Sequence, residues 1–255
     1  MKKRSFLFLQ GVASPFFDKL TDTLNNAGIQ TCRLEFCGGD GSFHRLGHTR
    51  KFIGKLECLD QYYTELFSDL QVTDIVLFGD TRPVHRPAIK LAKALKVNVH
   101  VYEEGYLRPD WITLDSGGVN AFSPLNNKEP NFFRSEVKNL PRDVKNQKTG
   151  YSQWVRLSHD LRYNIARTSD SVRFPNYKRH RVDHPLSEYL GWAKRYPALI
   201  PLSWKAKYQI KKLLEEKVGY YVYPLQLSGD SQVRVHSPFE NVNEATLSIL
   251  QSFAK

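Results

Sequence analysis

The chain has 255 residues, of which 41% are hydrophobic and 13% aromatic, and this is enough apolar material for one or two folded domains. The longest apolar runs are far shorter than the roughly 18 residues of a membrane span, so we expect no spanning segment. Three cysteines without a CxxC pair argue against a zinc finger and a disulfide framework, and we expect free thiols and no metal site.

The formal net charge is +11, from 37 Lys and Arg against 26 Asp and Glu, which indicates a negatively charged partner. Between Arg156 and Lys212, thirteen basic residues accompany four acidic ones, with Trp and Tyr interleaved. This combination is typical of a membrane interface or a nucleic-acid groove. A solvated helical surface whose aromatic residues face the core is an equally good interpretation.

The first half of the chain, residues 5–122, alternates short β-rich runs with helical patterns, which predicts a parallel sheet covered by helices. The expected strands are SFLFLQG from Ser5, IQTCRLEF from Ile29, DIVLFG from Asp74 and VNVHVYEE from Val97. The expected helices lie at about residues 15–27, 50–70 and 85–95.

The rest of the chain has a different pattern. Residues 126–216 form the basic, aromatic and helical segment, and no strand alternation is evident there. VGYYVYPLQLSGD, from Val218, then predicts a buried strand, and NEATLSILQSFAK predicts a helix. Because one strand and one helix cannot bury a core, residues 217–255 either join the first sheet or begin an incomplete second domain.

The predicted strands of the first half end in polar or glycine-rich turns, which meet at the ligand-binding crevice of an open parallel sheet. Gln10 and Gly11 follow the first strand, and Gly39 and Asp40 lie in CGGDG after the second. CGGDG permits close approach of a ligand, but it lacks the spacing of a phosphate-binding loop.

The third turn, GDTRPVH, groups Asp80, Arg82 and His85 near the start of the next helix, where anions are favoured. Arg82 suits either a fork onto an anionic ligand or a structural pair with Asp80.

The fourth turn, EEGYLRPD, holds two adjacent carboxylates that point to opposite faces of a strand. We expect Glu104, which is nearer the turn, to face the crevice, with Arg108 close enough to clamp an anionic sugar. A purely structural corner is the alternative interpretation.

The last turn, QLSGDSQVRVHS, contains Gln226, Asp230, Ser231 and His236. A carboxylate at a strand end suits a nucleophile or a general base in glycosyl transfer. An ordinary turn aspartate is the alternative. We take Asp230 as the candidate catalytic residue and the other three as candidate substrate ligands.

Several long motifs follow one another along the chain: FLFLQG, SPFF, FCGGD, LFGDTRPVH, EEGYLRPDWIT with GVN, YPLQLSGDSQVRVHSPF and SFA. In order and spacing they resemble the bacterial capsule polysaccharide synthesis proteins of the KpsS type. The resemblance covers nearly the whole chain, and motifs this long and ordered are specific.

The resemblance implies an α/β protein of the GT-B architecture, with two facing Rossmann-like domains. Residues 1–125 then form the acceptor-side domain, and residues 217–255 begin the donor-binding domain. It also implies a retaining transferase that moves β-Kdo from CMP-Kdo to a lyso-phosphatidylglycerol or to a growing Kdo linker. Asp230 takes the place of the family's catalytic Asp, and Glu104 and Arg108 fall in its E-G-[YF]-x-R motif.

The implied surroundings follow from the same resemblance. We expect no cofactor besides the donor substrate CMP-Kdo. The expected partners are an anionic phospholipid acceptor, the membrane surface and other capsule synthesis or export proteins, without nucleic acid. The expected location is cytoplasmic, peripheral at the inner face of the inner membrane.

The sequence departs from the family pattern in one respect. Family members continue past the SFA helix into a strand that ends in K-x-HP, whose His is expected to hold the CMP phosphate, and this chain stops at Lys255. We therefore expect the chain as given to be weak or inactive as a transferase. A non-catalytic capsule-assembly component is the alternative, and a nucleic-acid binder is disfavoured because no recognition motif accompanies the charge.

Overall fold

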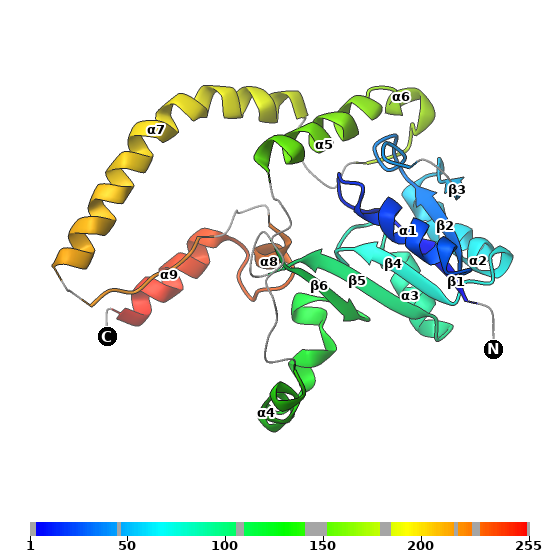
Figure 1. The fold of residues 1–255 in the computed structure, drawn as a ribbon, viewed down its shortest axis with the longest axis horizontal. Coiled ribbons are helices and arrows are strands. Elements are labelled where there is room, and N and C mark those ends of the chain that lie inside the picture. Colours follow the sequence, from blue (N-terminus) through cyan, green and yellow to red (C-terminus); the bar gives the residue numbers. More distant parts are fainter. Residues whose placement is uncertain are drawn as a thin grey trace.

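The computed structural model describes residues 4–44, 47–105, 110–140, 152–178, 185–216, 219–225 and 230–253. Among these residues, six strands form one sheet: β1 Ser5–Phe8, β2 Gln30–Glu35, β3 His48–Lys51, β4 Asp74–Phe78, β5 Asn98–Glu104 and β6 Ile112–Ser116. The strand order is β3-β2-β1-β4-β5-β6, and β1 to β5 are parallel while β6 is antiparallel to β5 (Figure 1).

Helices cover both faces of this sheet and extend away from it. The α-helices of the described residues are α1 Phe16–Asn26, α2 Leu59–Asp69, α3 Arg86–Ala94, α4 Pro130–Glu136, α5 Gln153–Ala166, α6 Asp170–Arg173, α7 Pro185–Glu215, α8 Ser231–Arg234 and α9 Val242–Phe253. Short 3-10 turns lie at Leu56–Cys58, Asn120–Phe122, Pro124–Asn127 and Val137–Asn139.

The core has two layers because the strands are apolar on both faces. In β1, Phe6 and Phe8 pack with Phe17 of α1, whereas Leu7 lies in the larger cluster with residues of α2 and α3. A strand that is buried on both sides reads as a continuous apolar run, as SFLFL does. Tyr63 of α2 is fully buried and donates its hydroxyl hydrogen to the Val84 carbonyl at 2.7 Å.

The four strands expected in the first half are confirmed as β1, β2, β4 and β5, and two of the expected helices are confirmed as α1 and α3. The third expected helix, residues 50–70, is wrong over its first part, because residues 48–51 form β3 and α2 begins only at Leu59. The HTRK segment is polar because β3 lies at the edge of the sheet, where side chains meet water. The antiparallel strand β6 was not expected.

The prediction for the C-terminal part is half confirmed. The expected helix is α9, but the described residues 219–225 of the expected strand lie in no sheet. Tyr221 and Val222 are 84% and 77% exposed. A strand needs a neighbour to pair its backbone, and no described residue pairs with this segment. The fold is therefore a mixed α/β, Rossmann-like one, and the second half of a GT-B architecture stays a prediction.

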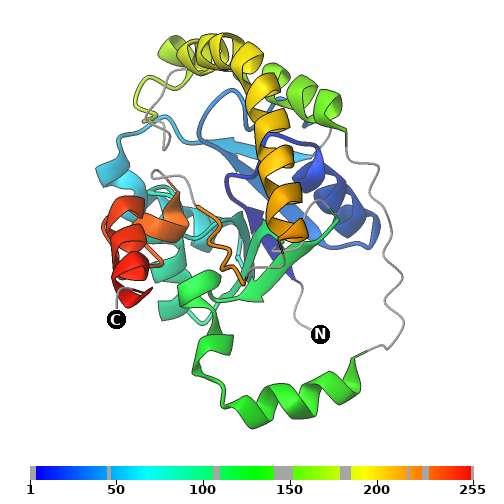
Figure 2. The same ribbon diagram turned by 90° about the vertical axis from the view of Figure 1, so that its left-hand side faces the viewer.

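The basic, aromatic segment divides into two parts. Residues 152–178 pack on the sheet unit, where Phe174 is buried and Asn176 donates to the Ile53 carbonyl at 2.8 Å. The long helix α7 instead arches away from the sheet (Figures 1 and 2). In the first part Phe174 is buried but Trp154 is 79% exposed, so the core-facing interpretation of the aromatic residues holds only in part. Most aromatic side chains of α7 are exposed. No helix within the described ranges is long and apolar enough to cross a membrane.

Asp74 joins three central strands at their amino ends. Its carboxylate accepts hydrogen bonds from Arg4 at 2.5 Å, His100 at 2.8 Å, Thr73 at 2.7 Å and Asn98 at 3.1 Å. Burial raises its pKa, but these hydrogen bonds outweigh burial and bring the pKa to about 2. The ionised carboxylate therefore stabilises the fold.

We expect the Asp74→Asn variant to unfold more easily at neutral pH. The folded-state pKa lies below the ordinary value of 3.8, so the stabilisation is complete above pH 4 and is lost as the pH falls towards 2. The expected loss at pH 7 is about 1–2 kcal/mol, measured by urea denaturation. Asp22→Asn, at an exposed position of α1, is the control, and a penalty for Asp74→Asn that persists unchanged at pH 2.5 would contradict this account.

Candidate functional site

The carboxyl ends of β1 and β4 lie side by side where the strand order reverses, the place at which open α/β sheets bind ligands. Gln10 and Gly11 follow β1, and Asp80 and Arg82 follow β4. Nη1 of Arg82 donates to the Gly11 carbonyl at 2.8 Å, so the first and third turns are tied together. Arg82 donates to a backbone carbonyl, whereas Asp80 accepts the Val119 N–H at 2.8 Å. Binding of an anionic ligand by Arg82 stays a prediction.

The turn after β4 depends on Gly79. Its φ of +70° lies in the left-handed region, which a side chain disfavours, and a Cβ there would lie 3.4 Å from Oε2 of Glu103. His85, which is fully buried, places Nδ1 2.7 Å from the Gly79 carbonyl oxygen. The third and fourth turns therefore meet as the sequence predicted.

Asp40 is buried at the centre of the carboxyl edge. Its carboxylate accepts hydrogen bonds from the backbone N–H of Phe36 at 2.9 Å and of Cys37 at 3.2 Å. Nε2 of Gln10 donates to both carboxylate oxygens at 3.1 and 3.2 Å, and the Tyr163 hydroxyl donates at 3.2 Å. Burial raises the pKa of Asp40 in spite of these donors.

Helix α5 covers this turn. A Cβ at Gly39 would lie 2.5 Å from the Tyr163 ring, so only glycine permits the helix to approach this closely. The Gly38 N–H donates to Oδ1 of Asp170 at 2.7 Å, and Arg167 pairs with Oδ2 of Asp170 at 3.1 Å. The close approach that CGGDG permits is therefore to the chain's own helix. Substrate contact by Gly39 and Asp40 stays a prediction.

Two tyrosines of this cover were missed from the sequence. Tyr163 contacts Asp40, and the Tyr177 hydroxyl accepts from Nε2 of Gln10 at 3.0 Å. Burial raises the pKa of both hydroxyls, so they stay protonated. Burial likewise raises the pKa of the neighbouring Cys37 thiol to about 12, which makes it inert as a nucleophile. The interleaving of aromatic and basic residues was the available signal, but it does not identify which aromatic residues turn inward.

Asp80 and His236 meet although 155 residues separate them in the sequence. Oδ1 of Asp80 lies 3.8 Å from Nε2 of His236, and Oδ2 accepts the Val119 N–H at 2.8 Å. The two side chains are 5% and 4% exposed, and the Phe122 ring packs edge-on against the imidazole with centroids 5.0 Å apart. The start of the C-terminal segment therefore lies beside the end of β4.

Asp230 begins helix α8 within that segment. Its carboxylate accepts the Gln232 N–H at 3.0 Å, which caps the helix, and the side chain is partly exposed. The Ser231 carbonyl accepts the His236 N–H at 3.2 Å, so both predicted ligands lie in the same short turn. Gln226 and Arg108 lie outside the described residues.

The two adjacent glutamates have different surroundings, and which of them meets a substrate stays a prediction. Glu103 lies beside Gly79, and burial raises its pKa against the attraction of Arg82. Glu104 is more exposed and places Oε1 3.9 Å from Nη2 of Arg156 on α5. Glu103 therefore belongs to the group around Asp80, and a catalytic role of Glu104 stays a prediction.

No cluster of three or more metal-ligating side chains occurs within the ranges that the structure describes.

Residues 73–255 match the sequence profile of a family described as "Capsule polysaccharide biosynthesis protein". The chain belongs to this family. It is 30% identical over 263 residues to the capsule polysaccharide export protein KpsS of Escherichia coli, covering 99% of this chain and 64% of the relative. It is 31% identical over 257 residues to the capsule polysaccharide modification protein LipB of Neisseria meningitidis serogroup B, covering 98% and 61%. The chain thus spans less than two thirds of the length of these relatives.

The packing of α5 on the turn after β2 gives a direct test. We expect Gly39→Ala to lower the stability by about 1–3 kcal/mol, because the added methyl overlaps the Tyr163 ring. Gly191→Ala is the matched control, since no atom lies within 4 Å of its added Cβ inside α7. Thermal denaturation of both variants measures the difference, and equal melting temperatures would contradict the described packing.

Proposed function

We propose that this chain acts in capsule polysaccharide biosynthesis as a retaining glycosyltransferase, which adds β-Kdo from CMP-Kdo to a lyso-phosphatidylglycerol-type lipid. Family membership supports the pathway. The observation that carries the site is the contact between His236 and Asp80, where the segment with Asp230 lies beside the carboxyl edge of the sheet. We infer that a substrate bound at this edge would meet polar groups of the strand-end turns and of this segment.

The proposed reaction has two displacements. The Asp230 carboxylate attacks the anomeric carbon of Kdo, and CMP leaves with the bonding electrons. The lipid hydroxyl then attacks the same carbon and loses its proton to Glu104, and the Asp230 carboxylate leaves. Two inversions give net retention.

The negative charge of the donor needs cations and backbone donors at the strand ends. Arg82, His85, Arg108 and His236 are the proposed ligands of the phosphate and carboxylate groups. The polar groups proposed to bind the sugar hydroxyls are Gln10, Gly11, Gly39, Asp40, Asp80, Gln226 and Ser231.

Mass-detected transfer from CMP-Kdo to a fluorescent lyso-phosphatidylglycerol analogue tests this function. We expect Asp230→Asn to lose at least 1,000-fold in rate, on the order of the roughly 4 kcal/mol that a nucleophile supplies. Asparagine caps a helix as well as aspartate does, so this variant keeps the α8 turn and removes only the nucleophile.

Asp22→Asn is the control for charge removal, and it should transfer like the parent chain. Product from the parent and an unchanged rate for Asp230→Asn would refute Asp230 as the nucleophile. No product from any of the three would favour the second candidate function, a non-catalytic capsule-assembly component. The exposed segment 219–225 favours that candidate, because its apolar side chains are available to a partner protein.

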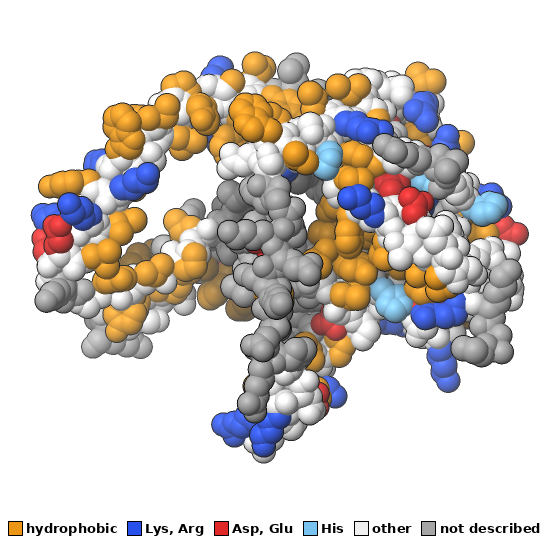
Figure 3. All heavy atoms as spheres, viewed as in Figure 1, with side chains coloured by type: hydrophobic (Ala, Val, Ile, Leu, Met, Phe, Trp, Pro, Cys, Tyr) orange, Lys and Arg blue, Asp and Glu red, His pale blue; other side chains and the backbone are white. Residues whose placement is uncertain are grey.

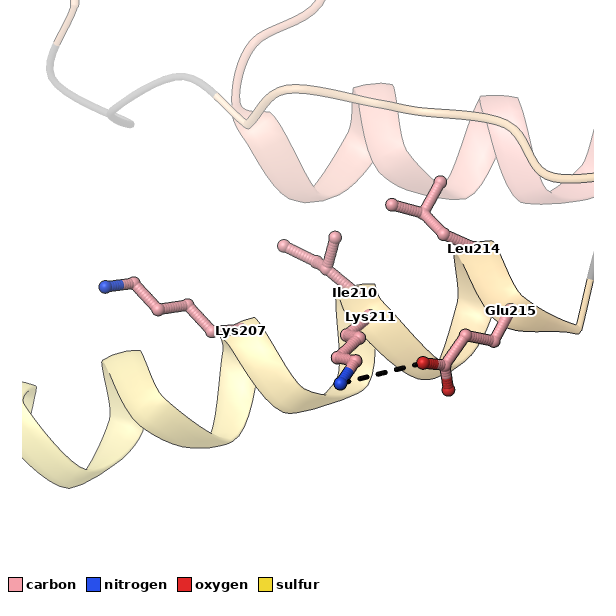
Figure 4. Close-up of a pocket in the computed structure, with 5 residues that line it drawn as sticks. All are labelled: Lys207, Ile210, Lys211, Leu214 and Glu215. Atoms are coloured by element: carbon pink, nitrogen blue, oxygen red, sulfur yellow. Dashed lines mark ion pairs between the residues drawn. The ribbon is translucent and has the colours of Figure 1, made fainter.

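Helix α7 is the proposed membrane-facing element. Large apolar side chains along it are exposed, among them Trp192 at 56%, Trp204 at 68% and Tyr208 at 69% (Figure 3). Lysines lie among them, and Figure 4 shows Ile210 and Leu214 beside Lys207 and Lys211. Tryptophan and tyrosine with lysine suit the interface of an anionic bilayer.

We expect the chain to co-sediment with vesicles of phosphatidylcholine and phosphatidylglycerol (70:30) and to bind pure phosphatidylcholine at least tenfold more weakly. The double variant Lys205→Glu/Lys207→Glu should lose at least tenfold in affinity for the anionic vesicles, at about 1 kcal/mol per basic residue. Lys90→Glu, on α3, is the matched control. Equal binding of both vesicle types would refute the charge-based contact.

A further inference from the structure

A polar pocket lies over the edge strands of the sheet, apart from the turns after β4 and β5. It encloses about 310 Å³ above the carboxyl ends of β2 and β3, and the loop after β2 and residues near the ends of α5 and α6 complete it. Its side chains come from Glu35, Ser42, His44, Thr49, Lys51 and Arg173. None of these residues was singled out from the sequence.

Glu35 is the buried carboxylate of this pocket. The residue is 7% exposed, and it lines the pocket. A Cβ at Gly41 would lie 2.6 Å from Oε1, which shows how closely the loop passes over it. Burial also raises the pKa of Glu35, although Lys51 lies opposite it on β3. A ligand that brings hydroxyl groups to the pocket could donate them to this carboxylate.

His44 supplies the complementary group. Its Nδ1 lies 3.3 Å from Oδ1 of Asp18, and its buried Nε2 has no hydrogen-bond partner among the described residues. Ser42 donates to the Gly39 carbonyl at 2.7 Å, so its oxygen remains able to accept from a ligand. The pocket therefore offers acceptors and an imidazole nitrogen together, which is the pattern that hydroxyl groups of a sugar require.

The rim of the pocket is cationic. Lys51 and Arg173 are both exposed and line it from opposite elements, β3 and α6. Their two positive charges exceed the single negative charge of Glu35. The pocket therefore favours a ligand that carries a negative group of its own. The volume is at the small end of the roughly 300–1,000 Å³ typical of small-molecule sites, which fits one sugar unit better than a nucleotide sugar.

We propose that this pocket binds one sugar-acid residue, with its hydroxyls donating to Glu35 and its carboxylate held by Lys51 and Arg173. The class of ligand rests on the proposed function in capsule carbohydrate synthesis, but the binding does not depend on the transfer reaction. The pocket thus holds a sugar that does not react, and Asp230 does not take part in it.

Titration calorimetry with free Kdo as the probe tests the proposal. We expect Glu35→Gln, Lys51→Ala and Arg173→Ala each to weaken binding at least tenfold, and neutral galactose to bind at least tenfold more weakly than Kdo. Lys90→Ala, at an exposed position of α3, should bind like the parent chain. Glu35→Gln should melt at or above the parent temperature at pH 7, because it removes a buried carboxylate whose pKa is raised by burial.

The outcomes separate the two proposals. Absence of Kdo binding, or equal binding by the Lys51→Ala and Arg173→Ala variants, would overturn the pocket assignment. If those results accompany transfer that depends on Asp230, the transferase function stands and the pocket fails. Kdo binding that depends on Lys51 and Arg173, without any transfer, would support the pocket and reject the transferase.

Discussion

Burial of the Asp40 carboxylate is the interaction on which the arrangement of the carboxyl edge depends. A buried carboxylate is tolerated only when donors surround it, and here the donors come from β1, from its own turn and from α5. Gln10 is oriented by Asp40 and Tyr177 together, so the end of β1 cannot reorganise independently of the cover. Helix α5 thus contributes to the stability of the sheet, although it begins more than thirty residues after β6 in the chain.

The carboxyl edge has two distinct parts as a result. In one part, Asp80 lies beside His236 of the C-terminal segment. Around Glu35, the contacts are local to the edge strands and the loop above them. The buried network of Asp40 and Gln10 separates these parts and fixes both. A substrate long enough to reach both parts would be held at two points of one rigid edge.

The central strands could be predicted from the sequence, but the edge strands and the long-range contacts around them could not. β1 and β4 were predicted because a strand buried on both faces must be apolar throughout. β3 was missed because an edge strand needs no apolar side chains, and HTRK has none. The convergence of the turns follows from parallel pairing, whereas the contact of Asp80 with His236 follows from long-range packing, which no local pattern encodes. The choice between the adjacent carboxylates Glu103 and Glu104 depends on the strand register and stays a prediction.

Two prolines lie in the interior of the long helix α7. Pro197 and Pro201 have no N–H, so the carbonyls of Ala193 and Pro197 receive no hydrogen bond from the next turn. Because the two carbonyls are four residues apart, both openings lie on one side of the helix. The two missing hydrogen bonds therefore make residues 193–201 the place where this long helix departs most easily from a straight axis.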